Sequence, residues 1–403
     1  MPLRRCIRSS ARRAASTSTD TRRSRKLTGH PFGTGDDACQ QWFAWYEQNR
    51  GRTQAEWLAD RFRGLATLPT GPIDGAGVRV LLSVLGQPEF ESNGSRGREP
   101  PLEPVYAKRV LQSLDKAMVG QEASEAAASG TAQLKRGAAR IARDLPDGRA
   151  ELVRLARDDD RSVRLVASEQ LLEIARRERA QPEAPLTRVA GEFDYDPRRS
   201  GDVLFFPVHG QSVAFSLSET RSLGVQAPPP AEPVPDLPLP TERRPDGFAR
   251  QGDLFAVLTC PISGNTYPGP GKAVLEVWSL ATKEKLYAKV LHEGLISGCR
   301  LYSSAGVFVV TTGSLTAVLE AQDGALRWEL PVSAWSSAIG EGLLAVSRYG
   351  QIDLLDLADG ALVANYAPKQ PAHGGVIEHL EVFNGRLFAF RESEVLVFAL
   401  PKR

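Results

Sequence analysis

The feature that most constrains the fold of this chain is a hairpin pattern that occurs five times in its C-terminal half. In each copy an apolar strand meets a short turn, and a second strand follows in which apolar and polar residues alternate. The copies occupy residues 202–217, 253–259 with 273–280, 306–321, 342–357 and 386–400. A repeat of this kind predicts several small antiparallel sheets that follow one another along the chain.

Further strands accompany these hairpins. Each of the three middle copies is followed by a third strand candidate, and two of those begin after the hairpin turns Asp323-Gly324 and Asp359-Gly360. A fourth candidate precedes each of the last three copies, as in ISGCRLYSS, WSSAIG and VIEHLEVF. Four strands per unit is the pattern of propeller blades, so we expect residues 187–403 to form an antiparallel all-β propeller of about five blades.

The last copy ends at Arg403 without an outer strand. In closed propellers the missing strand often comes from the other end of the repeat region, and TRVAGEFDY (187–195) is placed to supply it. That pairing would remove the exposed edge of an open sheet. The alternatives are a fan completed by a partner chain and an open, truncated propeller.

One phrase in the repeat resembles known propeller families. Asp323-Gly324-Ala325-Leu326-Arg327-Trp328 has the D-G-x-x-x-W form found in quinoprotein-like (PQQ-like) and WD40-like propellers. The copy at Asp359 has Val363 and Ala364 at its end instead of tryptophan. Because only one copy keeps the full motif, we expect the propeller fold and no cofactor, and a quinone-dependent enzyme is the weakest of the alternatives.

The region 36–180 has helical periodicity. Trp42, Trp45 and Tyr46 share one face of the first predicted helix, and Trp57 begins the face of the second. The residues 78–86 are apolar but fit either a helix or a strand. The predicted helices span residues 36–50, 53–65, 102–114, 132–145, 148–158 and 158–177.

The last two of these helices resemble a HEAT-type repeat. In that repeat a D-x-x-x-V-R turn joins two antiparallel helices, and here the turn is Asp159-Asp160-Arg161-Ser162-Val163-Arg164. Residues 29–58 also resemble a segment of bacterial HEAT-like proteins. The resemblance implies a short α-helical solenoid over residues 36–180, in which stacked neighbours bury each apolar face. A compact helical bundle is the alternative.

Residues 1–35 are expected to form a basic disordered tail. Residues 1–26 have a net charge of +8, whereas the whole chain has +2, and such a composition lacks the apolar surface needed to fold. A transit peptide, a nucleic-acid-binding arm and a start site assigned too far upstream are the other interpretations. Four cysteines without C-x-x-C spacing, and no apolar run of membrane-spanning length, favour a cytoplasmic protein with no membrane contact.

Two inserts interrupt the repeat. A Pro-rich insert covers residues 227–245, and PISGNTYPGPGK (261–272) separates the inner strands of the second blade. If four strands run antiparallel, the second turn of each blade and the connection to the next blade emerge on one face. We therefore expect a binding surface on that face, formed by His209, Tyr267, Trp335, Arg348, Tyr349 and His373.

The sequence contains no recognised catalytic or metal-binding motif. GNTYPGPGKA lacks the spacing and the hydroxyl of a phosphate-binding loop. His373 and His379 do not form H-E-x-x-H, there is no G-x-S-x-G elbow, and Asp353, Asp356 and Asp359 lack the spacing of a calcium loop. We therefore expect no catalytic, cofactor or metal residues.

These patterns favour a non-catalytic scaffold or regulatory protein whose partners are other proteins. The first alternative is a hydrolase or lyase with its active site in the central funnel of the propeller, built from loop residues that a sequence pattern does not reveal. The second is a nucleic-acid-associated protein, with binding through the basic N-terminal arm alone and strong salt dependence.

Overall fold

The computed structural model describes the following residues: 44–45, 47–49, 51–52, 73–87, 102–181, 185–191, 193, 197–209, 211–228, 230, 235, 237–238, 243–261, 269–296, 299–332, 334–348, 350–368 and 376–401. The chain divides into two compact units, Met1–Gln170 (the helical unit) and Leu171–Arg403 (the sheet unit). The predicted basic tail lies outside the described residues, as do Trp42 and Trp57. None of the described helices combines the length and the apolar character needed to cross a membrane.

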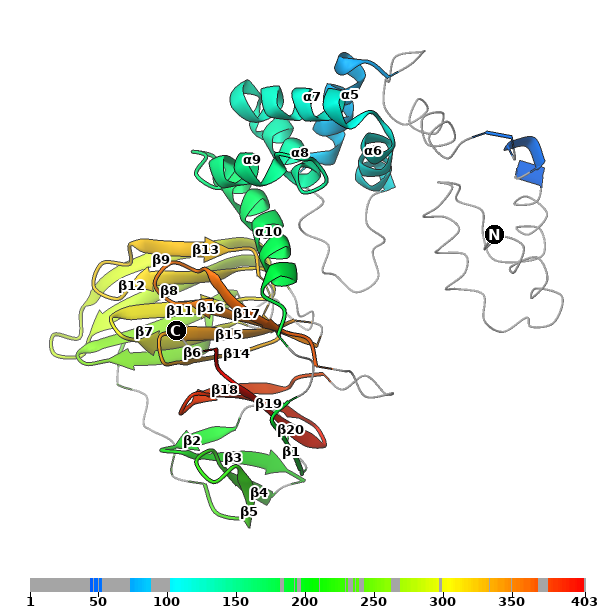
Figure 1. Cartoon of the computed structure of the whole chain (residues 1–403). Coiled ribbons are helices and arrows are strands. Elements are labelled where there is room, and N and C mark those ends of the chain that lie inside the picture. The colour runs from blue at the N-terminus through cyan, green and yellow to red at the C-terminus, as the bar shows by residue number, and fades with distance from the viewer. Residues whose placement is uncertain are drawn as a thin grey trace. The chain divides into compact units, whose positions relative to one another are not determined.

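The helical unit is built from consecutive helices (Figure 1). The segment of uncertain type becomes a helix, because Asp74 accepts a hydrogen bond of 2.9 Å from the N–H of Gly77 and so caps it. The described helices are α5 (Gly75–Leu85), α6 (Leu102–Ser113), α7 (Lys116–Ser129), α8 (Ala132–Ala142), α9 (Gly148–Leu155) and α10 (Arg161–Glu178), the last of which continues into the sheet unit.

Helix α7 was not predicted from the sequence. Its buried face consists of Val119 and three alanines, and alanine gives little apolar contrast with the polar residues around it. Asp115 caps the helix by accepting hydrogen bonds of 3.0 Å from the N–H groups of Ala117 and Met118. The Asp115 cap and the high helix propensity of alanine together specify this helix.

Helices α5 and α8 approach each other backbone to backbone. A Cβ atom added to Gly137 would lie 1.9 Å from the carbonyl oxygen of Leu82, and one added to Gly86 would lie 1.8 Å from that of Gln133. Two buried arginines of α8 complete the contact. Arg136 donates to the carbonyl of Gly86 at 2.8 Å, and Arg140 donates to the carbonyl of Leu85. These guanidinium groups satisfy carbonyls that the end of α5 leaves unpaired.

The acidic turn before α10 is a helix cap. The Asp160 carboxylate accepts hydrogen bonds from the N–H groups of Ser162 (2.8 Å) and Val163 (3.2 Å). The hydroxyl of Ser162, followed by these backbone groups, lowers the pKa of Asp160. Asp158 pairs with Lys135 of α8 at 2.7 Å. The predicted helix–turn–helix is therefore present, with its turn held by hydrogen bonds to carboxylates.

The sheet unit contains five four-stranded antiparallel sheets within the described residues, an arrangement consistent with a propeller (Figure 1). In four of the sheets the spatial order follows the chain order. These sheets are β2 (Arg198–Ser200) to β5 (Arg221–Val225), β6 (Arg243–Gln251) to β9 (Lys285–Ile296), β10 (Arg300–Ser304) to β13 (Leu326–Leu330), and β14 (Ser336–Gly340) to β17 (Leu362–Tyr366).

The inner strands of these sheets are the predicted hairpins. They are β3 (Val203–Val208), β4 (Gln211–Ser216), β7 (Leu254–Pro261), β8 (Gly269–Ser279), β11 (Val307–Thr311), β12 (Thr316–Glu320), β15 (Leu343–Arg348) and β16 (Gln351–Asp356).

The fifth sheet confirms that the segment at residue 187 supplies the missing strand. Its order is β1-β20-β19-β18, formed by β18 (His379–Phe383), β19 (Arg386–Arg391), β20 (Glu394–Ala399) and β1 (Thr187–Ala190). Thr187 is paired with Val397 and Ala190 with Glu394. Strand β1 therefore occupies the outer position that the last repeat lacks.

The second sheet differs from the prediction at both inserts. Strand β7 extends to Pro261 and β8 begins at Gly269, so Pro261 and residues 269–272 belong to the hairpin strands instead of to a loop. Residues 262–268 lie outside the described part of the chain. Strand β6 begins at Arg243, inside the range assigned to the Pro-rich insert. Backbone pairing with β9, from Gly269 opposite Ile296 onward, overrides the turn-forming composition of this stretch.

Apolar side chains fill the spaces between neighbouring sheets. One buried cluster joins β10–β13 to β14–β17, a second joins β14–β17 to β18–β20, and a third joins β2–β5 to β18–β20. The third cluster is aromatic: Phe390 packs against Phe193, Phe206 and Phe215 with ring centroids 4.9–5.4 Å apart. These contacts fix the sheets relative to one another inside the unit.

Aromatic side chains of three outer strands also bridge to the following sheet. Tyr287 donates to the carbonyl of Ala321 at 2.9 Å, Trp328 to that of Leu357 at 3.0 Å, and Tyr366 to that of Ala399 at 2.7 Å. The tryptophan of the D-G-x-x-x-W motif is one of these three bridges.

The Asp-Gly turns lie under two of these rings. Gly324 and Gly360 have φ of +69° and +74°, and a Cβ added to either would lie within 2.8 Å of the ring of Tyr287 or Trp328, respectively. Glycine is required there for the backbone conformation and for the close approach.

Candidate functional site

Trp335 and Arg348 lie side by side where β14 begins and β15 ends. We call this side of the sheet β14–β17, formed by the ends of its strands, its edge. Trp335 directly precedes β14, and its N–H donates to the carbonyl of Ser347 at 2.9 Å, next to Arg348 at the end of β15. The Trp335 side chain is 49 % exposed, whereas Ser336 and Ser347 beneath it are buried. The structure therefore brings two of the predicted site residues together on a fixed backbone.

The neighbouring sheet extends this edge. Ahead of Trp335, the N–H of Ala334 donates to the carbonyl of Thr312 at 3.2 Å, in the turn between β11 and β12. In that same turn the hydroxyl of Ser314 lies 3.2 Å from Nε2 of His292, near the end of β9. Contacts along the edge thus connect three sheets. We call His292, Ser314, Trp335 and Arg348 the Trp335 surface.

Buried hydroxyl groups support the Trp335 surface from below. The Tyr302 hydroxyl donates to the carbonyl of Ser337 at 2.6 Å, and the hydroxyls of Thr311 and Ser337 are 3.0 Å apart. Ser336 and Ser347 are joined by a hydrogen bond of 3.0 Å from a backbone N–H to a hydroxyl. Because these bonds link β10, β11, β14 and β15, the backbone that carries Trp335 is held rigidly.

Of the remaining predicted residues, the structure describes His209, which lies on another sheet. His209 is exposed in the turn between β3 and β4, at the corresponding edge of a different sheet, with φ of 48°. Tyr267, Tyr349 and His373 lie outside the described residues. Sequence reasoning missed His292 and Ser314. The position of Ser314 in a turn between two inner strands is the signal that would have identified it, because all such turns reach the same edge.

Two groups of ionisable residues that resemble catalytic sets are engaged in packing. The Asp353 carboxylate is buried. It accepts hydrogen bonds from the guanidinium group of Arg176 at 3.0 Å and from the side-chain amide of Asn365 at 2.9 Å. Burial works to lower the pKa of Arg176, but the hydrogen bond and charge of Asp353 outweigh it and raise the pKa. The backbone of Asn365 also pairs with Ala180, so this ion pair fixes the end of α10 on the outer strand β17.

The second group lies between β18 and β2. Nε2 of His379 is 3.2 Å from Glu381, whose other carboxylate oxygen accepts from Arg199 at 2.8 Å. The imidazole packs edge-on against Phe206 at 6.1 Å and tilted against Phe390 at 5.7 Å. The imidazole thus contacts two aromatic rings and a carboxylate, as expected of a histidine with a packing role.

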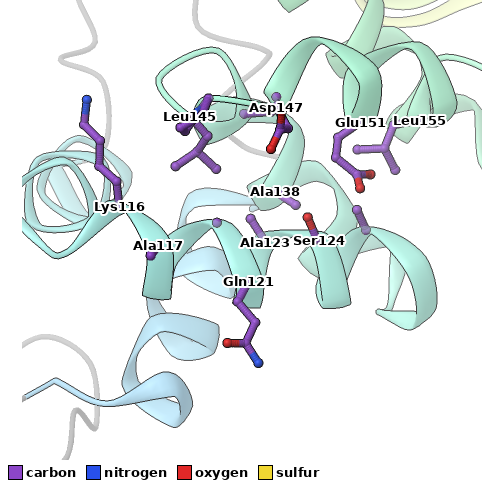
Figure 2. A pocket seen from close by; sticks show the side chains of 15 residues that line it. Lys116, Ala117, Gln121, Ala123, Ser124, Ala138, Leu145, Asp147, Glu151 and Leu155 are labelled. Atoms are coloured by element: carbon purple, nitrogen blue, oxygen red, sulfur yellow. The ribbon is translucent and has the colours of Figure 1, made fainter.

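The helical unit contains a pocket of about 280 Å³ between α7, α8 and α9 (Figure 2). Its floor is made of small side chains, including Ala123, Ala138 and Ala142, beside Leu155. Its rim mixes one cation, two carboxylates and neutral polar groups: Lys116, Gln121, Ser124, Asp147 and Glu151. Glu151 already pairs with Arg154 at 2.7 Å. The small side chains of the floor suit a small apolar group.

Comparison with known proteins yields similarity to solved structures only: no family model and no curated protein matches the chain. One similar structure is the β-propeller domain of Cps50 (Swd1) from Myceliophteria thermophila, with a TM-score of 0.37 and 12 % identity over 55 % of this chain and 100 % of that one. A second is glutaminyl cyclase from Myxococcus xanthus, with a TM-score of 0.27 and 15 % identity over 54 % and 100 %. A third is a europium-containing methanol dehydrogenase, with a TM-score of 0.24 and 14 % identity over 31 % and 24 %.

Proposed function

We propose that this chain is a non-catalytic scaffold or regulatory protein that binds other proteins through the Trp335 surface. The observation that carries the proposal is a half-exposed tryptophan next to an arginine on a rigid sheet edge. Tryptophan and arginine are the residue types that most often dominate the energy of protein interfaces. A tryptophan that is held in place before binding loses little conformational entropy when a partner covers it.

The architecture proposed for this role is a HEAT-like helical domain followed by a propeller of five blades. Support for five blades comes from the five four-stranded sheets and from β1, which occupies the outer position beside β20. Support for the HEAT-like domain comes from the capped turn between α9 and α10. Both modules provide large, firm surfaces for contact with partners.

We further propose that the protein works in the cytoplasm. The four cysteines have no spacing that suggests paired thiols, and Cys299, which directly precedes the outer strand β10, is buried. A buried thiol of this kind is typical of proteins in reducing compartments.

The test is affinity capture with the immobilised full chain, followed by mass spectrometry of the retained proteins. Trp335→Ala and Arg348→Ala are compared with Leu326→Ala, which removes another exposed apolar side chain (41 %) at the start of β13, on the opposite edge of the sheets. We expect a set of proteins that the wild type and Leu326→Ala retain and that Trp335→Ala loses at least tenfold. Equal retention by all variants, or no retained protein, contradicts the proposal.

A further inference from the structure

The two faces of the sheet β6–β9 have different neighbours, and one of them carries a buried tryptophan, Trp278. Register places Phe248, Phe255, Val257, Glu276 and Trp278 on the same face, because directly paired residues of antiparallel strands point the same way. The opposite face carries Tyr287, which bonds to the next sheet. We call the first set the Trp278 face.

The Trp278 face contains a buried donor and a buried acceptor without partners. Glu276 and Trp278 are 6 % and 5 % exposed. One carboxylate oxygen of Glu276 accepts from Lys285 at 3.2 Å, but Oε2 of Glu276 and Nε1 of Trp278 have no hydrogen-bond partner in the described part of the chain. Buried polar atoms are almost always paired in folded proteins, so this pair of atoms is suited to a ligand that offers both a carbonyl and an N–H.

Exposed apolar side chains border these two atoms. Phe248 is 41 % exposed and stacks on Phe255 at 5.8 Å, and Val290 of β9 is 47 % exposed on the same face, opposite Val274. The ammonium group of Lys285 lies 5.4 Å from the centre of the Trp278 ring. An aromatic surface with an indole N–H at its centre is the kind of surface that recognises proline-rich, extended peptides, whose carbonyls are free to accept.

The chain itself shows which side chains this face accepts. Leu237 packs on the buried cluster of Phe255, Val257 and Trp278, although it belongs to the Pro-rich segment between β5 and β6. Its neighbours in sequence form Pro235-Asp236-Leu237-Pro238-Leu239-Pro240. Pro235 and Leu237 are half-buried, while Pro238 is exposed. Leu237 therefore covers the apolar part of the face and leaves the donor and the acceptor unpaired.

We propose that the Trp278 face is a binding site for a leucine-containing, proline-rich peptide segment of a partner protein. In the isolated chain the Leu237 side chain occupies the apolar part of the site. A partner segment displaces Leu237 because the partner pairs one carbonyl with Nε1 of Trp278 and one N–H with Oε2 of Glu276, two atoms that Leu237 leaves unmatched. This site is separate from the Trp335 surface, so the two proposals stand or fall independently.

The test uses a fluorescein-labelled peptide with the sequence of residues 233–240 and the full-length chain, with anisotropy as the readout. Leu237→Asp removes the internal occupant, and we expect this variant to bind the peptide at least tenfold more tightly than the wild type. The free peptide, unlike the tethered segment, is able to shift along the face until one of its carbonyls meets Nε1 of Trp278. Adding Trp278→Phe keeps the aromatic ring but removes the N–H, and should therefore weaken binding at least tenfold.

The matched control is Trp328→Phe in the same Leu237→Asp background. The indole N–H of Trp328 is already bonded to Leu357, on another sheet, so we expect peptide affinity to stay unchanged. Should Leu237→Asp lower the melting temperature, Leu237→Ala is measured in its place, with the same order of affinities expected. Equal affinity of the wild type and the Leu237 variant, or no loss with Trp278→Phe, overturns the proposal.

Discussion

The two units of this chain achieve close packing in opposite ways. In the helical unit, backbones meet directly: Gly137 lies against Leu82, and Arg140 reaches the carbonyl groups at the end of α5. In the sheet unit, large side chains such as Phe390 fill the space between sheets, and aromatic groups bond across it. Added atoms should therefore disrupt the contact between helices, whereas removal of large side chains should disrupt the contacts between sheets.

The largest effect should come from removing a side chain in the sheet unit. Phe390 is fully buried among three other phenylalanines. Phe390→Ala is expected to reduce the free energy of unfolding by about 3–5 kcal/mol, through lost burial and the cavity that remains. Urea unfolding of the full chain, followed by circular dichroism, measures this. Leu326→Ala, at an exposed site, should change it by less than about 0.5 kcal/mol. Similar values for both variants would break the comparison.

Adding a single methyl group to the helical unit should have the next largest effect. Gly137→Ala forces α5 and α8 apart, because a Cβ would lie 1.9 Å from a backbone oxygen, and should cost about 2–3 kcal/mol. Gly120→Ala on α7 is the matched control, because no atom lies within 4 Å of its Cβ position, and it should stabilise by about 0.5–1 kcal/mol. Thermal unfolding followed at a helix-sensitive wavelength distinguishes them. Stabilisation by both substitutions would refute the close contact.

The smallest expected effect is on how the stability of the sheet unit depends on pH. Burial raises the pKa of Tyr366 to about 12, and burial together with the charge of Asp323 raises that of Tyr287 to about 12. In the unfolded chain a tyrosine titrates near 10. Their contribution to stability is therefore complete below pH 10 and is lost as the pH rises from 10 toward 12.

Tyr366→Phe should flatten this loss. Unfolding free energies measured at pH 9, 10 and 11 are expected to fall less steeply for the variant than for the wild type. A variant whose stability falls in parallel with the wild type above pH 10 would show that the buried hydroxyl of Tyr366 does not carry the effect.

The two kinds of packing also explain what could be predicted from sequence. The sheets could be predicted because strands with alternating apolar and polar residues, and the Asp-Gly turns, recur periodically in the sequence. The outer strand missing from the last repeat also indicated that the segment now seen as β1 would pair with β20. The helical unit has a fainter signal, because a glycine contact or an arginine-to-carbonyl bond has no period. Helix α7, with an alanine face, was missed for that reason.

The candidate surface was predictable only in part. Strand direction places Trp335 and Arg348 at the same edge, and the structure joins them through the bond from Trp335 to Ser347. The contribution of His292 depends on the length of β9, which runs further than its alternating sequence suggested. The unpaired atoms of Glu276 and Trp278 follow from three-dimensional burial, which no spacing in the sequence encodes.

The pairing of β1 with β20 has a consequence for how the protein is made. Residues 187–190 leave the ribosome long before residues 394–397, to which they pair. The fifth sheet therefore remains incomplete during most of translation, and its aromatic neighbours stay accessible to water until the final strand emerges. Such a long-range pairing is slow to form because a long loop must close first. The nascent chain thus passes through a period in which chaperones have an apolar surface to recognise.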